Sequence, residues 1–202
     1  MQFNMGRKGA VIIGAFILLA AGFLSLAINK SDDTDMRDMS RHSGHMSTST
    51  SADYTSADIM FLQMMIPHHQ QAIELSDLAL KISKNPEILK LATQIKAAQG
   101  PEIEAMKSWL RESGNSEDPG HSMDGMSGML SSDELKNLGT LSGSSFDRAF
   151  LTGMIEHHEG AVHMVMMIED SQNSDYAAFG AKIKKVQSEE IELMKKLLES
   201  IK

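Results

Sequence analysis

The sequence predicts an all-α fold in which a duplicated helical hairpin forms a four-helix bundle, preceded by an N-terminal transmembrane helix. A nine-residue stretch occurs twice, at residues 61–69 and 150–158, and each copy ends in two histidines. A second segment, residues 95–110, recurs at residues 183–198 with nearly the same spacing. Apolar residues follow helical spacing, with almost none of the alternation typical of strands. Two copies of a two-helix unit make a bundle of four helices.

The N-terminal segment predicts export. An apolar run extends from Gly9 to Ile28 with a single polar interruption, and Arg7 and Lys8 precede it. About 20 apolar residues can cross a bilayer as a helix, and the positive-inside rule then places the following domain outside the cytoplasm. The alternative is a signal peptide cleaved after a small-x-small site at residues 25–27. We therefore expect either a single-pass protein of the cell membrane or a secreted one.

The composition limits the classes of function. Cysteine is absent, which excludes disulfides, thiolate zinc sites and thiol nucleophiles, whereas methionine occurs 17 times. The formal net charge is −8, and residues 1–30 carry three basic residues and no acidic one, which leaves −11 for the rest. Such a surface disfavours nucleic acid, whose binding depends on neutralising phosphates, but is compatible with cations.

Two polar segments carry methionine and histidine at short intervals. Residues 29–53 are rich in Ser, Thr and Asp, and residues 114–129 are rich in Gly, Ser and Asp. Such compositions are typical of flexible linkers. Their methionines and histidines are Met36, Met39, His42, His45, Met46, His121, Met123, Met126 and Met129. The segments are either neutral linkers or loose arms that collect soft metal ions.

Capping signals mark where the helices start. The pattern Ser/Thr-x-x-Asp/Glu opens a helix through reciprocal hydrogen bonds and occurs at Thr55, Ser131 and Ser144. Asn85 and Asn173 are further N-cap candidates. The expected helices span residues 55–83, 86–111, 132–139, 145–170 and 174–202. Gly100-Pro101 should kink or split the second of them.

These signals give the predicted domain organisation. Residues 1–30 form the membrane anchor or signal peptide, and residues 31–54 form the linker. The bundle domain is expected over residues 55–202. It divides into a first repeat over 55–113, a linker with a short helix over 114–143, and a second repeat over 144–202.

The two histidine pairs are predicted to face the bundle interior. At about 100° per residue, His68 and His69 fall on the apolar side of their helix, and His157 and His158 occupy the same positions in the second copy. A methionine precedes each pair by three and four residues, a spacing at which helical side chains touch. Imidazole suits several transition metals, and thioether sulfur selects soft ions, above all Cu(I).

We therefore expect a metal site built from both repeats. The first-choice ligands are Met65, His68, His69, Met154, His157 and His158. Second-rank candidates are Met64, His163, Met164 and Met167, of which His163 lies off the main face and suggests a separate outer site. The competing interpretation is ordinary packing, in which interior histidines are hydrogen-bonded. Methionines such as Met60, Met106 and Met194 would then only fill gaps in the core.

Two other classes of site receive less support. A di-iron carboxylate centre uses a Glu-x-x-His motif on two helices, and this motif is absent from the sequence. Four glutamates do repeat, but we expect them on solvated faces or paired with lysines. They are Glu102, Glu104, Glu190 and Glu192. Hydrolytic chemistry lacks a nucleophile motif such as Gly-x-Ser-x-Gly.

With these motifs the chain resembles the bacterial exported family called domain of unknown function 305. The resemblance rests on a repeated Phe-Leu-x-x-Met-Ile-x-His-His, at residues 61–69 and 150–158, and on the matching segments 99–106 and 187–194. It covers about residues 55–200. The resemblance implies a ferritin-like four-helix bundle that is exported or membrane-anchored. For some members it also implies copper binding and copper tolerance.

The leading hypothesis is a non-enzymatic, extracytoplasmic protein that binds copper, with Cu(I) favoured, and buffers or delivers it. The second is a redox enzyme of the ferritin-like kind, with iron as the runner-up metal. The third is a structural or interaction module without metal. The expected partners are metal ions and, through residues 1–30, the membrane. The oligomeric state and any copper-handling partner protein stay open.

Overall fold

The structure is a computed structural model and describes residues 54–118, 120 and 125–201. The chain divides into two compact units, residues 1–44 and 45–202, and everything described here belongs to the second. Its helices are α1 (Ser56–Ile82), α2 (Pro86–Glu112), α3 (Ser132–Leu138), α4 (Gly143–Val165) and α5 (Ser174–Ser200). The described residues contain no strand, so the predicted all-α helical bundle is confirmed.

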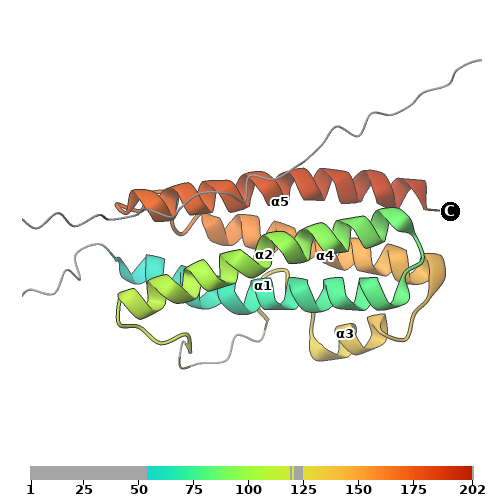
Figure 1. Cartoon of the computed structure of the whole chain (residues 1–202), viewed down its shortest axis with the longest axis horizontal. Coiled ribbons are helices and arrows are strands. Elements are labelled where there is room, and N and C mark those ends of the chain that lie inside the picture. The colour runs from blue at the N-terminus through green and yellow to red at the C-terminus, as the bar shows by residue number, and fades with distance from the viewer. Residues whose placement is uncertain (1–53, 119, 121–124, 202) are drawn as a thin grey trace, which may run out of the picture. The chain divides into compact units, whose positions relative to one another are not determined.

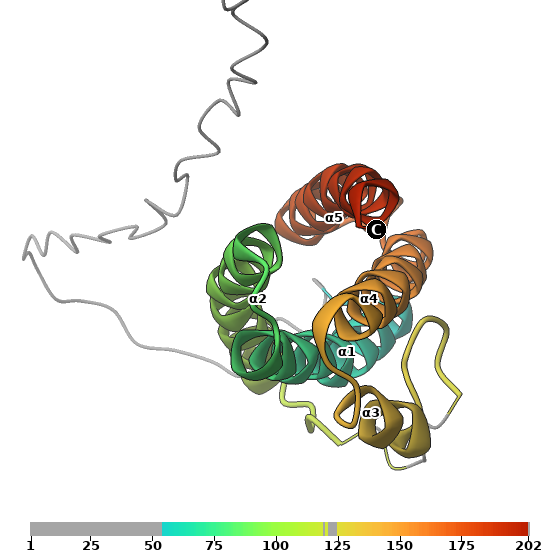
Figure 2. The ribbon, with the colours of Figure 1, turned by 90° about the vertical axis from the view of Figure 1, so that its right-hand side faces the viewer.

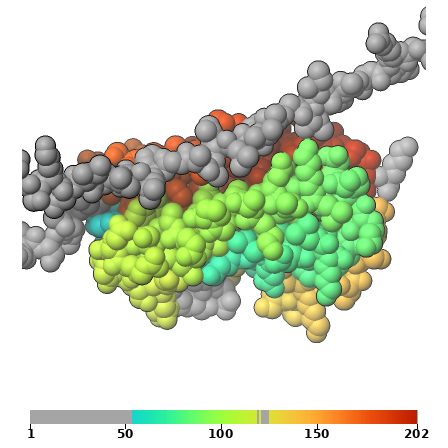
Figure 3. All heavy atoms as spheres, in the orientation of Figure 1, coloured from blue at the N-terminus to red at the C-terminus, as the bar shows by residue number. Residues whose placement is uncertain are grey.

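The four long helices pair as two hairpins. α1 packs on α2, α4 packs on α5, and the two hairpins meet chiefly through α1 and α4 (Figure 1). Viewed along the helices, the long helices surround one interior, and the short α3 lies outside, beside α4 (Figure 2). Side chains of α2 form much of the molecular face seen in Figure 3 and cover part of α1.

The expected capping residues start four of the five helices. Thr55 and Ser131 each close a capping box, with Asp58 and Glu134 as the reciprocal acceptors. These side chains satisfy amide groups that a helix start would otherwise leave unpaired. The other two caps are Asn85 and Asn173. Their side chains accept hydrogen bonds from backbone N–H groups at the starts of α2 and α5.

The bounds of α4 differ from those predicted. Its N-cap is Ser142 rather than Ser144, and the Asp147 carboxylate accepts a hydrogen bond from the Ser83 hydroxyl at 2.6 Å instead of closing a capping box. The helix ends at Val165, five residues early. Tight i→i−3 turns follow, and they bring Ile168 into the core.

The prediction that Gly100-Pro101 would split the second helix is wrong. α2 runs without a break from Pro86 to Glu112 and contains Pro101 in its interior. Much of the strain before a proline comes from contact of its ring with the Cβ atom of the preceding residue. Gly100 has no Cβ, so it reduces this strain.

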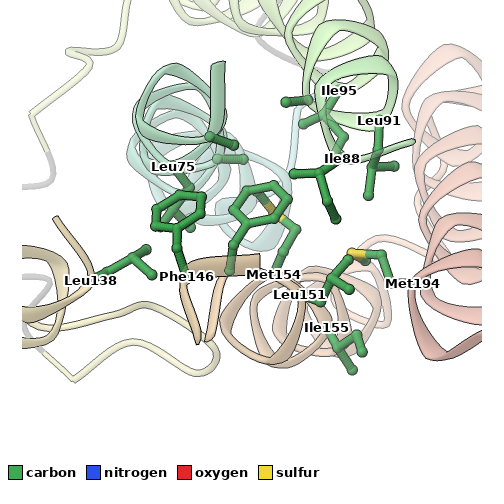
Figure 4. Packing of buried hydrophobic residues seen from close by; sticks show 14 of the residues in the cluster. Leu75, Ile88, Leu91, Ile95, Leu138, Phe146, Leu151, Met154, Ile155 and Met194 are labelled. Atoms are coloured by element: carbon green, nitrogen blue, oxygen red, sulfur yellow. The ribbon is translucent and has the colours of Figure 1, made fainter. Parts of the chain in front are cut away.

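The apolar core consists of two separate clusters. The first apolar cluster joins the C-terminal half of α1 to the N-terminal half of α2, and the N-terminal half of α4 to the C-terminal half of α5. It includes Leu75, Ile88, Met154 and Met194, and Figure 4 shows both methionines among other buried apolar side chains. The second apolar cluster joins the opposite halves of the same helices. Every long helix therefore has a short stretch between the two clusters.

The predicted membrane helix and the first linker lie outside the described residues. Within residues 54–118, 120 and 125–201, no helix is long and apolar enough to span a bilayer.

Candidate metal centre

Buried polar residues occupy the stretch of each helix between the two apolar clusters. α1 and α4 each contribute a histidine pair, and α2 and α5 each contribute a glutamine and, three residues later, a glutamate. We call these eight residues the polar layer: His68, His69, Gln99, Glu102, His157, His158, Gln187 and Glu190. The predicted inward orientation of the histidines is confirmed, since all four have 0% exposure.

One histidine from each hairpin meets its counterpart at the centre of the layer. The ring centroids of His68 and His157 are 3.7 Å apart, with an angle of 39° between the ring planes. Within the described residues, neither ring nitrogen of either residue makes a hydrogen bond. The contact therefore places four imidazole nitrogens at the junction of α1 and α4 without a hydrogen-bond partner in this part of the chain.

The outer histidine of each pair makes a hydrogen bond to a glutamate of its own hairpin. His69 Nε2 lies 3.1 Å from Glu102 Oε2, and His158 Nε2 lies 2.8 Å from Glu190 Oε2. Glu102 Oε1 is also 3.2 Å from the Lys182 ammonium on α5. The same His–Glu pairing thus occurs in both hairpins, and one of the pairs is linked across to the other hairpin.

The prediction that Glu102 and Glu190 would lie on solvated faces is wrong. Glu102 has 7% exposure and Glu190 is half-buried, whereas Glu104 and Glu192 are exposed as expected. The sequence held a signal for this. Each glutamate lies on the same helical stripe as buried apolar residues: Glu102 is four residues before the buried Met106 in α2, and Glu190 is four residues before the buried Met194 in α5.

The environment keeps the central histidines neutral at physiological pH. Burial, and after it repulsion from His69, lowers the pKa of His68 to about 3, although the Ser127 backbone acts in the opposite direction. Burial also lowers the pKa of His157 well below its usual range, assisted by repulsion from His68 and His158. A neutral imidazole retains a lone pair, which is the state that metal coordination requires.

Unpartnered polar atoms concentrate in the polar layer. Of the twelve buried side-chain nitrogen and oxygen atoms without a hydrogen-bond partner in the described residues, ten belong to it. They include both amide atoms of Gln99 and of Gln187. Buried polar atoms are normally paired, because leaving one unpaired costs about 1–3 kcal/mol. This concentration is therefore expected only where a bound ion or water completes the layer.

The histidines and carboxylates alone do not form a metal site in the described part of the chain. No three side chains of the His, Asp and Glu type converge there in a geometry that would hold an ion. Two of the imidazole nitrogens face glutamates, and the His68 and His157 rings lie against each other at a tilt of 39°. A metal in this layer therefore requires methionine sulfur or a small rotation of the rings.

Two methionines stand where they could supply that sulfur. Met65 and Met154 have 0% exposure and precede His69 and His158 by one helical turn. Residues four apart on a helix are neighbours on its surface. Met106 and Met194 are fully buried in the apolar clusters, as expected for packing.

The second-rank candidates are spread over different surroundings. Met164 is buried in the second apolar cluster, and Met64 and Met167 are partly buried against it. His163 is exposed and stands apart from the polar layer. The expectation that Met60 packs in the core is wrong, since it is 48% exposed.

Part of the second Met/His segment closes over the site. The strap, residues 125–130, crosses α4 so closely that a Cβ atom at Gly160 would collide with the Ser127 carbonyl. The Gln71 amide fixes its end by donating to Leu130 O at 2.8 Å and accepting from Leu130 N at 2.7 Å. Met126 has 9% exposure.

The strap thus brings Met126 into the second apolar cluster. The other Met/His candidates of the linkers lie outside the described residues, namely Met36, Met39, His42, His45, Met46, His121 and Met123.

Solved structures with the same fold include metal-bound forms. CopM in the Cu(I)-bound form is 33% identical with a TM-score of 0.61, over 73% of this chain and 97% of that one. CopM is also known in Cu(II)-bound and Ag-bound forms. A DUF305 fragment from Deinococcus radiodurans is 30% identical with a TM-score of 0.68, over 72% of this chain and 97% of that one.

Two further relatives extend the comparison. A DUF305 protein from Streptomyces coelicolor, described as a predicted secreted protein, is 32% identical with a TM-score of 0.67, over 72% of this chain and 92% of that one. Uncharacterized protein L153 of Acanthamoeba polyphaga mimivirus is 44% identical over 55 residues, which are 27% of this chain and 36% of that protein.

The sequence profile of the family described as "Domain of unknown function (DUF305)" matches residues 58–198, a range that includes both histidine pairs and both His–Glu pairs. The chain belongs to the DUF305 family.

Proposed function

We propose that the protein binds copper, with Cu(I) favoured, in the polar layer between the two hairpins, and that it buffers or delivers the ion outside the cytoplasm. The observation that carries the proposal is the set of ten unpartnered buried polar atoms in this one layer. An ion bound there would convert unpaired imidazole nitrogens into ligands. The donor set suits a soft ion, because it combines neutral imidazole with thioether and contains no thiolate.

Both hairpins would contribute ligands in this proposal. The inner histidines, His68 and His157, come from different hairpins and already touch. Met65 and Met154 lie one turn before the outer histidines. We include two earlier predictions in this proposal. They are the internal duplication predicted from the sequence and the ferritin-like relationship implied by the family resemblance.

The comparisons favour copper over iron. The CopM structures contain Cu(I), Cu(II) and silver, and silver is a soft ion like Cu(I). No comparison favours iron. The alternative is a packing module without metal, and the experiment below distinguishes it from a copper-binding protein.

We also propose that the bundle lies outside the cytoplasm. The support is the apolar run after Arg7 and Lys8, together with the description of the Streptomyces coelicolor relative as a predicted secreted protein. Residues 1–30 would anchor the chain in the membrane or be removed on export, and residues 31–54 would link them to the bundle.

A competition titration with Cu(I), Cu(II), Zn(II) and Fe(II) tests the metal. The purified protein is compared with a variant in which all four histidines of the polar layer are changed to alanine, and circular dichroism checks that this variant is still helical. We expect tight Cu(I) binding that the variant loses. A Met65→Leu, Met154→Leu variant gives a second test, because leucine fills a similar volume without a soft ligand.

The other outcomes would contradict the proposal in different ways. Preference for Fe(II) would contradict the metal assignment. Unchanged Cu(I) binding by both variants would place the copper outside the polar layer. No binding of any ion by the parent protein would leave the layer as a packing feature.

A further inference from the structure

The two His–Glu pairs determine which atom of each outer histidine is free. In both hairpins the glutamate oxygen faces Nε2, at 3.1 Å for His69 and at 2.8 Å for His158. The other nitrogen, Nδ1, is buried in both residues and has no hydrogen-bond partner among residues 54–118, 120 and 125–201. The same division between the two nitrogens therefore occurs independently in each half of the molecule.

The chemistry of the carboxylate fixes the position of the hydrogen. An ionised carboxylate can only accept hydrogen bonds, so the nitrogen that faces it must carry the hydrogen. In the first hairpin the Lys182 ammonium, 3.2 Å from Glu102 Oε1, favours the ionised carboxylate. In a neutral imidazole ring, a hydrogen on Nε2 leaves the lone pair on Nδ1.

We propose that Glu102 and Glu190 are positioning residues that hold the hydrogen of His69 and His158 on Nε2, so that Nδ1 of each is the atom presented to the metal. This inference rests on the proposed copper site, and it goes further by assigning donor atoms and naming two residues outside the ligand set. Carboxylates behind a ligating imidazole commonly fix its tautomer and orientation and increase its basicity.

The carboxylates also supply charge where a buried cation needs it. The inner histidines are neutral, and the methionines carry no charge, so a metal ion in the layer would otherwise lack a counter-charge. Glu102 and Glu190 place one negative charge behind each outer histidine. Lys182 offsets part of this charge in the first hairpin only, because it lies 3.2 Å from Glu102.

The test compares variants of the two glutamates with those of exposed neighbours. The test variants are Glu102→Leu and Glu190→Leu, which remove the acceptor. The matched controls are Glu104→Gln and Glu192→Gln, two residues further along the same helices and exposed. In metal-free protein with ¹⁵N-labelled histidine, long-range ¹H–¹⁵N spectra report which ring nitrogen carries the hydrogen. Cu(I) affinity is measured on the same samples.

We expect the hydrogen on Nε2 of both outer histidines in the parent protein. Glu102→Leu should remove this preference at His69 while leaving His158 unchanged, and Glu190→Leu should do the reverse. Each variant should weaken Cu(I) binding by about 10–100-fold, the range typical of residues behind a metal ligand. The control variants should change neither the tautomer nor the affinity.

Three results would overturn the inference. A hydrogen on Nδ1 in the parent protein would contradict the donor assignment, even if copper binds tightly. Weaker copper binding with unchanged tautomers would reduce the glutamates to a structural role. The expected tautomers in a parent protein that binds no Cu(I) would instead contradict the proposed function, and the donor role with it.

Discussion

At the scale of single residues, the central histidines carry the clearest energetic signature of the site. His68 and His157 are buried, touch each other and lack hydrogen-bond partners in the described structure. Such residues resist protonation, because a positive charge in this layer would be desolvated and close to a second imidazole. Burial therefore keeps both imidazoles neutral, and it lowers the stability of the folded protein in acid.

Metal-free protein should lose stability as the pH falls from about 6.5. The folded state holds the pKa of His68 at about 3, while the unfolded chain has the ordinary value of 6.5. Between these values the unfolded state binds a proton that the folded state does not, so unfolding becomes easier as the pH falls. His68 alone should cost about 2 kcal/mol between pH 7 and pH 5, and His157 acts in the same direction.

Urea unfolding at a series of pH values, with a chelator present, measures this loss. A His68→Gln variant should show a shallower dependence on pH. His163→Gln changes an exposed histidine and should leave the dependence as it is in the parent. Equal slopes for the parent and His68→Gln would contradict the assignment.

Replacing a buried methionine by leucine should affect Cu(I) binding at one position and not at another. Both methionines pack in the second apolar cluster, but Met65 precedes His69 by one turn on the same helix, whereas Met106 lies on α2, which carries no histidine. Both changes conserve volume and should cost less than about 1.5 kcal/mol of stability. Met65→Leu should weaken Cu(I) binding about tenfold or more, equivalent to about 1.4 kcal/mol, while Met106→Leu should not. Equal affinities for the two variants would remove Met65 from the ligand set.

At the scale of elements, the strap is the connection that depends most on close packing. It crosses α4 at Gly160, and its own Gly128 has a φ of 82°, which side chains larger than hydrogen rarely adopt. A Cβ atom at Gly128 would also lie 2.5 Å from the Glu156 carbonyl oxygen. Two glycines therefore let the strap approach the helix beside the second histidine pair.

Gly160→Ala should displace the strap. The added methyl group would meet backbone atoms of Ser127 and Gly128, which cannot turn away as a side chain can. We expect a loss of about 1–3 kcal/mol and faster amide exchange at Leu130, whose N–H bonds to Gln71.

Gly153→Ala is the matched control on the same helix. Its Cβ would touch only the Leu130 side chain, at 3.3 Å. The control should therefore have a smaller effect on stability, and thermal unfolding compares the two variants. Similar losses would show that the contact between strap and helix is not tight.

The helices themselves were largely predictable from the sequence, because their signals are local. Capping boxes at Thr55 and Ser131 involve residues three apart and need no tertiary contact. The early end of α4 was not predictable in this way. It depends on Ile168 turning into a core formed by all four long helices.

The histidines of the site were predictable, but their glutamate partners were missed. His68 and His69 share a helical face with apolar residues, and this periodicity is visible in one segment. The burial of Glu102 and Glu190 depends on a histidine from the other helix of the hairpin, 33 and 32 residues away. Residue type, in contrast to the periodicity, assigns an isolated glutamate to the surface, since an unpaired buried charge is costly.

At the scale of the whole molecule, the hairpins are joined by a few buried polar contacts in addition to apolar packing. The Ser83 hydroxyl, just after α1, donates to the Asp147 carboxylate of α4 at 2.6 Å, and both residues are buried. This bond links the end of the first hairpin's leading helix to the start of the second hairpin.

Removing this hydroxyl should destabilise the docking of the hairpins. Ser83→Ala leaves a buried carboxylate without its donor, which should cost about 1–3 kcal/mol. Ser76→Ala is the control, because the Ser76 hydroxyl is equally buried but bonds only within its own helix, to Ala72 O. Chemical unfolding followed by circular dichroism should show the larger loss for Ser83→Ala. A larger loss for the control would argue against a joining role.

The position of the polar layer between two apolar clusters also fixes the register of the helices. If α2 slid by one turn against α1, a shift of about 5.4 Å, Glu102 would leave His69 and face an apolar cluster. An identical slip of α5 against α4 would separate Glu190 from His158. Leucine, isoleucine and methionine side chains tolerate such slips, whereas a carboxylate separated from its partner does not. The layer that we propose to bind an ion thus also selects one alignment among several that the apolar side chains would accept.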